Sequence, residues 1–98
     1  MSITSHPAQI TLAPNVHARR FDSEVVILDL SRGLYFGLDE VGAEMWDRLL
    51  LGESPEQVGR ALVDRYAASE EQLVEDARSL ITKLRDAGLI VLLNRDEA

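Results

Sequence analysis

The sequence contains no cysteine among its 98 residues, and this absence excludes several kinds of site. Without cysteine there is no disulfide framework, no thiolate metal site and no cysteine nucleophile, which fits a protein of a reducing compartment. Histidine is also scarce, because His6 and His17 are the only two and neither stands near a second ligand or a nucleophile. The sequence therefore predicts no metal site and no histidine-based catalysis.

Long apolar runs are absent as well. A helix that spans a bilayer needs about 18 or more consecutive apolar residues, and the sequence contains no such run. The N-terminus also lacks the positively charged segment and the following apolar segment of a secretory signal. We therefore expect a soluble, cytoplasmic protein that makes no contact with a membrane.

Basic residues are too few to form a nucleic-acid-binding face. The net charge is -7, and the whole deficit lies in the second part of the chain. Residues 1–38 carry three basic and three acidic side chains, whereas residues 39–98 carry seven basic and fourteen acidic ones. Contacts with phosphates supply most of the non-specific affinity for nucleic acid, so this charge distribution predicts repulsion instead.

Sequence motifs of common enzymes are also missing. We find no P-loop, no dinucleotide-binding fingerprint, no zinc motif and no nucleophile elbow. Four carboxylates recur in one stretch: Asp39, Glu40, Glu44 and Asp47. A solvated helix face and the favourable charge at a helix N-terminus explain them without an acid–base pair. The sequence therefore predicts a protein that is not an enzyme and uses no cofactor.

The first half of the chain contains three predicted strands. Residues 16–21, 24–30 and 34–38 are bounded by turn signals, with Asp22-Ser23 before the second strand and Gly33 before the third. These signals predict a three-stranded antiparallel meander. Apolar residues lie on both pleat faces of residues 24–30, which predicts a central strand that is covered on both sides.

From Asp39 onward the apolar spacing becomes helical. The first helix is predicted over residues 39–51, with Trp46 in the core. The second begins at Ser54-Pro55, where serine caps the helix and proline suits its first position. The third begins with Ser69 and Gln72 in a capping-box arrangement and ends before Gly88.

These elements predict an α+β fold in which a three-stranded antiparallel sheet is followed by a three-helix bundle, in a winged-helix-like arrangement. Residues 1–15 are expected to form an extended N-terminal arm, with a short edge strand at 10–12. Residues 16–93 form the single domain, which ends with an extended piece at 89–93. Residues 94–98 are a polar tail.

The predicted strand 34–38 lies at an edge of the meander. Proteins usually protect such an edge with charge, proline or a bulge, and LYFGL has none of these. Unless residues 10–12 or 89–93 pair with it, we expect an extended partner peptide to add to this edge. Tyr35 and Phe36 lie on opposite pleat faces, and which of them lines the adjoining groove stays open.

A resemblance to a known family rests on three segments: VVILDLSRGLYFGLDEVGAEMWDRL, SPEQVGRALVDRY and EDARSLITKLRDAGLI. Over about residues 16–91 the chain resembles the PqqD-like family of leader-peptide recognition proteins. These proteins are the recognition elements for ribosomally synthesised and post-translationally modified peptides, or RiPPs. The pattern DLSRGLYFGLDEVG is more similar to the stand-alone members of lasso peptide biosynthesis than to the PqqD of pyrroloquinoline quinone biosynthesis.

The resemblance implies that the N-terminal leader of a precursor peptide binds as an added strand between the third strand and the third helix. A tyrosine of the leader would enter an apolar pocket between Tyr35 or Phe36 and Leu80. Matched onto this chain, the family pattern gives these peptide-binding residues: Leu34, Tyr35, Phe36, Gly37, Leu38, Leu73, Asp76, Ala77, Leu80, Lys83 and Leu84.

The resemblance further implies delivery of the precursor to a leader protease and an ATP-dependent cyclase, both separate proteins. The protein itself is expected to be a monomer or a weak homodimer that pairs through the same edge. Two alternatives stay open. One is a PqqD-type chaperone for a radical enzyme that modifies another peptide, and the other, disfavoured by the acidic helices, is a winged-helix transcription regulator.

Overall fold

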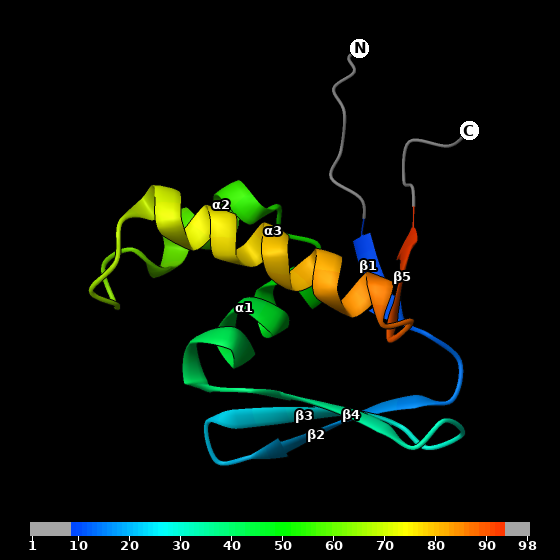
Figure 1. Ribbon diagram of the computed structural model, residues 1–98. Coiled ribbons are helices and arrows are strands. Elements are labelled where there is room, and N and C mark those ends of the chain that lie inside the picture. The colour runs from blue at the N-terminus through cyan, green and yellow to red at the C-terminus, as the bar shows by residue number, and fades with distance from the viewer. Residues whose placement is uncertain (1–8, 94–98) are drawn as a thin grey trace.

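The computed structural model describes residues 9–93 and contains five strands and three helices within them (Figure 1). The elements in chain order are β1 (Gln9–Leu12), β2 (Val16–Phe21), β3 (Glu24–Asp29), β4 (Leu34–Leu38), α1 (Glu40–Leu50), α2 (Pro55–Leu62), α3 (Glu70–Asp86) and β5 (Ile90–Leu93). No helix in this part of the chain is long and apolar enough to cross a membrane.

The three-stranded sheet has the order β2-β3-β4, with both pairs antiparallel. The three helices lie together over one face of this sheet (Figure 1). The predicted α+β fold, with a three-stranded antiparallel sheet and three helices, is therefore confirmed.

Strands β1 and β5 form a separate two-stranded antiparallel sheet, with Leu12 opposite Ile90. Ile10 and Ile90 are each 3% exposed, so this small sheet contributes to the core. The expected short strand at residues 10–12 therefore exists, and its partner is β5. Neither β1 nor β5 pairs with β4, whose outer edge has no partner strand among residues 9–93.

Only one face of β3 is covered, which corrects the prediction of cover on both sides. Val25 and Ile27 point toward the helices and are 2% and 0% exposed. Val26 and Leu28, on the opposite face, are half-buried, because no described element lies over this face of the sheet (Figure 1). The strand also ends at Asp29, one residue earlier than predicted, and Leu30 is 70% exposed in the following loop.

Local capping signals set the beginnings of the helices. The side chain of Asp39 accepts a hydrogen bond from the Gly42 N–H and caps α1. At α2, Ser54 and Gln57 form a complete capping box, each side chain bonding to the backbone of the other residue. These bonds satisfy N–H groups that have no partner inside a helix.

The N-terminus of α3 is capped by Ser69 alone, which corrects the predicted capping box. The Ser69 hydroxyl accepts from the Gln72 N–H, as expected. The Gln72 side chain, however, donates from Nε2 to Asp76 one turn further along the helix, at 2.8 Å. A glutamine at this position can either accept a hydrogen bond from the N-cap N–H or donate one to a side chain one turn further on, and here it donates to the Asp76 carboxylate.

The core lies between the helices and the inner face of the sheet. Trp46 is 2% exposed, which confirms its predicted place in the core. The other largest fully buried side chains come from the sheet, from α2 and α3 and from the residue before β5: Ile27, Val58, Leu62, Leu73, Leu84 and Leu89. This core holds β4 and α3 in fixed positions on either side of the site described next.

Candidate functional site

The β2–β3 hairpin determines which backbone groups of β4 point outward. Its turn has two residues, with Asp22 at φ 55°, and it joins Phe21 and Glu24, which are opposite each other. In a two-residue hairpin this closing pair is hydrogen-bonded, and bonded and non-bonded pairs alternate along the strands. The even-numbered residues of β3 therefore bond to β2, and the odd-numbered residues bond to β4.

On β4 the same alternation leaves two residues with unpaired backbone groups. Ile27 is opposite Phe36, so Phe36 directs its N–H and C=O inward to β3. Leu34 and Leu38 do the same, because each lies two positions from Phe36. Tyr35 and Gly37 direct theirs to the outer edge, where no described strand lies. Gly37 has no heavy atom within 4 Å of the place a Cβ would occupy, so a second backbone can approach closely there.

A cavity of about 750 Å³ lies beside this edge, between β4, the start of α1, the loop before α3, and α3 itself. A volume in the range of about 300–1,000 Å³ is typical of sites that bind small molecules. The cavity is lined by Phe36, Gly37, Leu38, Asp39, Val41, Gly42, Met45, Tyr66, Ala67, Ala68, Leu73, Asp76, Ser79, Leu80 and Lys83.

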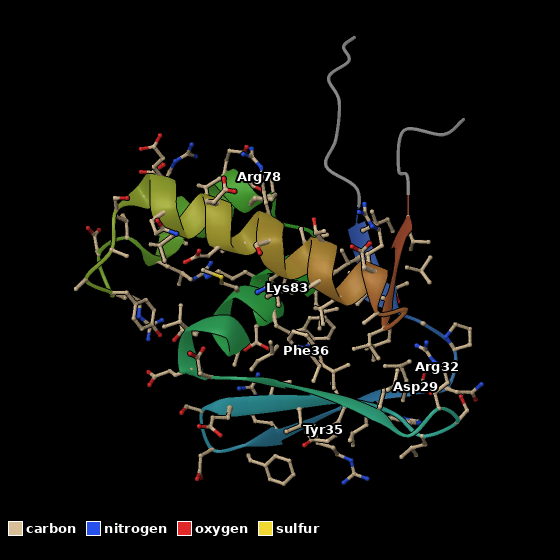
Figure 2. All side chains as sticks on the ribbon, in the orientation of Figure 1. Asp29, Arg32, Tyr35, Phe36, Arg78 and Lys83 are labelled. Carbon is tan, nitrogen blue, oxygen red and sulfur yellow. The ribbon has the colours of Figure 1, made fainter. Side chains whose placement is uncertain are left out.

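Apolar side chains form most of the cavity wall. Phe36 is half-buried and points from β4 toward α3, whereas Tyr35 points away from the helices on the other face of the sheet (Figure 2). Tyr35 is 75% exposed, so Phe36 is the aromatic side chain that lines the groove. Leu80 is 8% exposed and Leu73 is 2% exposed, and both belong to the core as well as to the cavity wall.

The charged residues of the cavity are Asp39, Asp76 and Lys83. Asp39 Oδ1 accepts from the Gly42 N–H at 2.9 Å, and Asp76 Oδ1 accepts from the Gln72 side chain. Lys83 makes no ion pair with any residue from 9 to 93. All three are exposed, so their charges are available to a bound molecule.

Tyr66 adds a polar group to the wall. Its hydroxyl is buried and has no hydrogen-bond partner within the described part of the chain. Burial raises the pKa of this hydroxyl above its ordinary value, and the nearby carboxylate of Glu44 raises it further. The group therefore stays protonated at neutral pH.

The structure brings together most of the peptide-binding residues predicted from the family pattern. Those that line the cavity are Phe36, Gly37, Leu38, Leu73, Asp76, Leu80 and Lys83. Ala77 and Leu84 do not line it, because both are 0% exposed and pack in the core. Leu34 and Tyr35 also lie outside it, with 42% and 75% of their surfaces exposed. Of these four, only Tyr35 can contact an added strand through the backbone groups that it directs outward.

Sequence reasoning missed the contributions of α1 and of residues 66–68. Val41 and Met45 face the cavity from the first turns of α1, and Tyr66 and Ala68 reach it from the loop before α3. Their apolar character was visible in the sequence, but only the packing of the helices shows that they face β4.

A partly buried ion pair ties the β3–β4 loop to the end of α3. Asp29 is 4% exposed and accepts hydrogen bonds from the Ser31 hydroxyl at 2.8 Å and from Arg32 Nε at 2.6 Å. The same guanidinium donates from Nη2 to the Ala87 carbonyl at 2.7 Å. Figure 2 shows Asp29 and Arg32 together at this end of the sheet. The contact therefore holds the loop that leads into β4 against the C-terminal end of α3. The sequence DLSRG carries a signal for it, since aspartate commonly bonds to the backbone two residues on.

Acid is expected to weaken this contact. The side-chain hydrogen bonds from Arg32 and then Ser31 lower the pKa of Asp29 from 3.8 to about 2. Because the pKa is lowered in the folded state, the stabilisation is fully present above about pH 4 and is lost as the pH falls through about 2. We expect the difference in urea midpoint between the wild type and Asp29→Asn to shrink between about pH 6 and about pH 2. The same difference at both pH values would contradict this role.

Within residues 9–93 there is no group of three histidine, aspartate or glutamate side chains placed to hold a metal ion. The site thus consists of an unpaired strand edge and an apolar cavity with charged residues at its rim. Such a site suits the binding of an extended peptide, whose backbone satisfies the edge and whose side chains enter the cavity.

Comparisons with known proteins agree with this geometry. Residues 24–90 match the family described as coenzyme PQQ synthesis protein D (PqqD). A solved structure described as lasso peptide synthetase B1 complexed with the leader peptide is similar to this chain, with a sequence identity of 30% and a TM-score of 0.78. The match includes 86% of the residues of this chain and 99% of the residues of that protein. TbiB1, solved in complex with the TbiA(beta) leader peptide, has a sequence identity of 31% to this chain and a TM-score of 0.69. The match includes 89% of the residues of this chain and 96% of the residues of TbiB1.

No curated protein matches the chain. The family match nevertheless spans most of the sequence, from the start of β3 to the start of β5, and so includes both walls of the groove. The two structural matches extend over nearly the full length of the proteins concerned. The chain therefore belongs to the PqqD-like family, as the resemblance of its sequence predicted.

Proposed function

We propose that the protein is a non-catalytic recognition protein that binds the leader of a ribosomally synthesised precursor peptide. The observation that carries the proposal is the unpaired edge of β4 beside the cavity, in a chain that is 30% identical to a protein solved with its leader peptide. The leader adds as a strand along β4 and bonds to the outward backbone groups of Tyr35 and Gly37. Its alternate side chains then face the cavity.

The likeness to two proteins solved with leader peptides, one of them described as a lasso peptide synthetase, supports a lasso peptide as the final product. The protein acts in the cytoplasm, where it holds the precursor near the leader protease and the cyclase. Tethering of this kind raises the effective concentration of the substrate without new chemistry.

The match to PqqD favours a second candidate function, a chaperone for a radical enzyme that modifies another peptide. Capture of either set of enzymes with the purified protein and its leader would separate the two.

The direct test is a fluorescence polarisation titration with labelled leader peptides encoded beside the gene of this protein. We expect saturable binding with a Kd between about 10 nM and 10 µM, because a disordered leader loses conformational entropy when it binds. Serine in place of the apolar anchors of the leader should remove binding. Mass spectrometry should find the precursor unchanged after incubation with the protein alone. Absence of binding by the folded protein, or a change in precursor mass, would contradict the proposal.

A further inference from the structure

One face of α3 carries two opposite charges on either side of an apolar residue. Asp76, Leu80 and Lys83 line the same cavity and are spaced by four and three residues. A helix rises about 1.5 Å per residue, so the two charged residues lie about 6 Å before and about 4.5 Å after Leu80 along the helix axis. The helical wall of the groove therefore changes from negative to positive along its length.

The strand side of the groove has the same polarity. Strand β4 and helix α3 run in opposite directions along the groove (Figure 1), so the end of β4 lies toward the start of α3. Asp39 follows the last residue of β4 and lines the cavity at this end, together with Asp76. Lys83 lies at the other end, above Phe36 (Figure 2).

These charges can interact with a bound peptide. Asp39 and Asp76 each use Oδ1 in a hydrogen bond, and the structure assigns no bond within residues 9–93 to either Oδ2. Lys83 has no ion-pair partner in the same part of the chain. The rest of the cavity lining is uncharged, so these three side chains are the charged groups that a peptide in the cavity can contact directly.

The direction of an added strand follows from the sheet. Both strand pairs of the three-stranded sheet are antiparallel, and antiparallel pairing is slightly more stable per residue than parallel pairing. An antiparallel peptide would have its N-terminal half beside the end of β4, near Asp39 and Asp76. Its side chains on one face repeat every two residues, about 6.8 Å apart, so the residues two before and two after the anchor lie within reach of the long side chains at the two ends of the groove.

We propose that the groove selects a leader by the order of its charges. The preferred peptide carries an apolar anchor between Phe36 and Leu80, a lysine or arginine two residues before the anchor, and an aspartate or glutamate two residues after it. This inference rests on the proposed function, because it specifies the class of peptide that the same groove accepts. The long-range field of the protein, with a net charge of -7, favours any cationic peptide, whereas the contact with Lys83 requires the carboxylate in one position.

The test uses two synthetic leader peptides of the same composition. One carries Lys two residues before the anchor and Glu two residues after it, and the other carries these two residues exchanged. In a fluorescence polarisation titration at low salt, we expect the Lys-first peptide to bind about tenfold more tightly. Because exposed charges are screened, the difference should narrow at about 0.5 M salt.

Variants of the protein locate the effect. The double variant Asp76→Lys with Lys83→Glu should reverse the preference between the two peptides. Arg19→Glu is the matched control for Lys83→Glu, because both substitutions change the net charge by the same amount. Arg19 is exposed on β2 and does not line the cavity. We expect Lys83→Glu to reduce the preference of the protein for the Lys-first peptide and Arg19→Glu to leave it intact.

The outcomes separate this inference from the function on which it rests. Equal affinity for both peptides, a preference of the wild type for the Glu-first peptide, or an equal effect of Arg19→Glu and Lys83→Glu would overturn the charge order. In each of these cases the peptide still binds, so leader recognition stands. Failure of the folded protein to bind either peptide would contradict leader recognition itself, and the charge order with it.

Discussion

Replacing Gly37 with proline is expected to weaken leader binding at least tenfold while the sheet stays folded. The N–H of Gly37 points to the free edge of β4, so proline removes a bond that only the leader would make. The ring also projects toward the position of the added strand, about 4.8 Å away. A tenfold loss of affinity corresponds to about 1.4 kcal/mol, which is close to the contribution of one hydrogen bond. The steric effect of the ring adds to this loss.

Phe36→Pro is the comparison that makes this experiment specific. The N–H of Phe36 bonds inward to β3, so proline there breaks the sheet itself and should reduce the circular dichroism signal. Gly37→Ala is the matched control, because a Cβ at this position meets no atom within 4 Å. The edge assignment would be refuted if Gly37→Pro bound the leader as tightly as Gly37→Ala, with both proteins folded.

Replacing Phe36 with serine is expected to weaken leader binding about 30-fold, or about 2 kcal/mol, as for an aromatic residue at the centre of an interface. The side chain is half-buried and lines the cavity, so its loss removes contacts with the leader and exposes little of the core. Polarisation titrations measure the change in affinity, and urea unfolding measures the change in stability. The fold should remain, because the core on the far side of the cavity is untouched.

Tyr35→Ser is the matched control for this prediction. Tyr35 is the neighbouring aromatic residue, but its side chain is 75% exposed on the other face of the sheet, so its loss should change leader affinity by less than about twofold. Equal losses of affinity for the two variants would show that the leader does not enter the cavity. Leu80 is unsuitable for this purpose, because at 8% exposure a charged residue there would unfold the protein and remove binding indirectly.

Local signals made much of the fold predictable from the sequence. Strand β4 has the predicted bounds, because the turn at Gly33 and the cap at Asp39 lie directly beside it. Ser54 and Ser69 likewise begin helices through bonds to residues three positions away. The pairing of β1 with β5 was not predictable, since it joins opposite ends of the chain and no local pattern identifies the partner.

The site was predictable where one element supplies it and not where several elements meet. The resemblance to the family supplied Leu73, Asp76, Leu80 and Lys83, and all four line the cavity from α3, while their contact with a peptide stays a prediction. Ala77 and Leu84 share the same helical repeat but face the core, and the family pattern does not separate these two faces. Val41 and Met45 were missed because their place in the groove depends on how α1 packs against the sheet.

Amide hydrogen exchange of β4, measured by NMR with and without a saturating leader peptide, tests strand addition most directly. We expect the amides of Tyr35 and Gly37 to exchange rapidly in the free protein and slowly in the complex, because only the leader bonds to them. The amide of Phe36 should be protected in both states, since it bonds to β3. Rapid exchange of Tyr35 and Gly37 in the saturated complex would show that the leader binds elsewhere and would contradict the proposed mode of recognition.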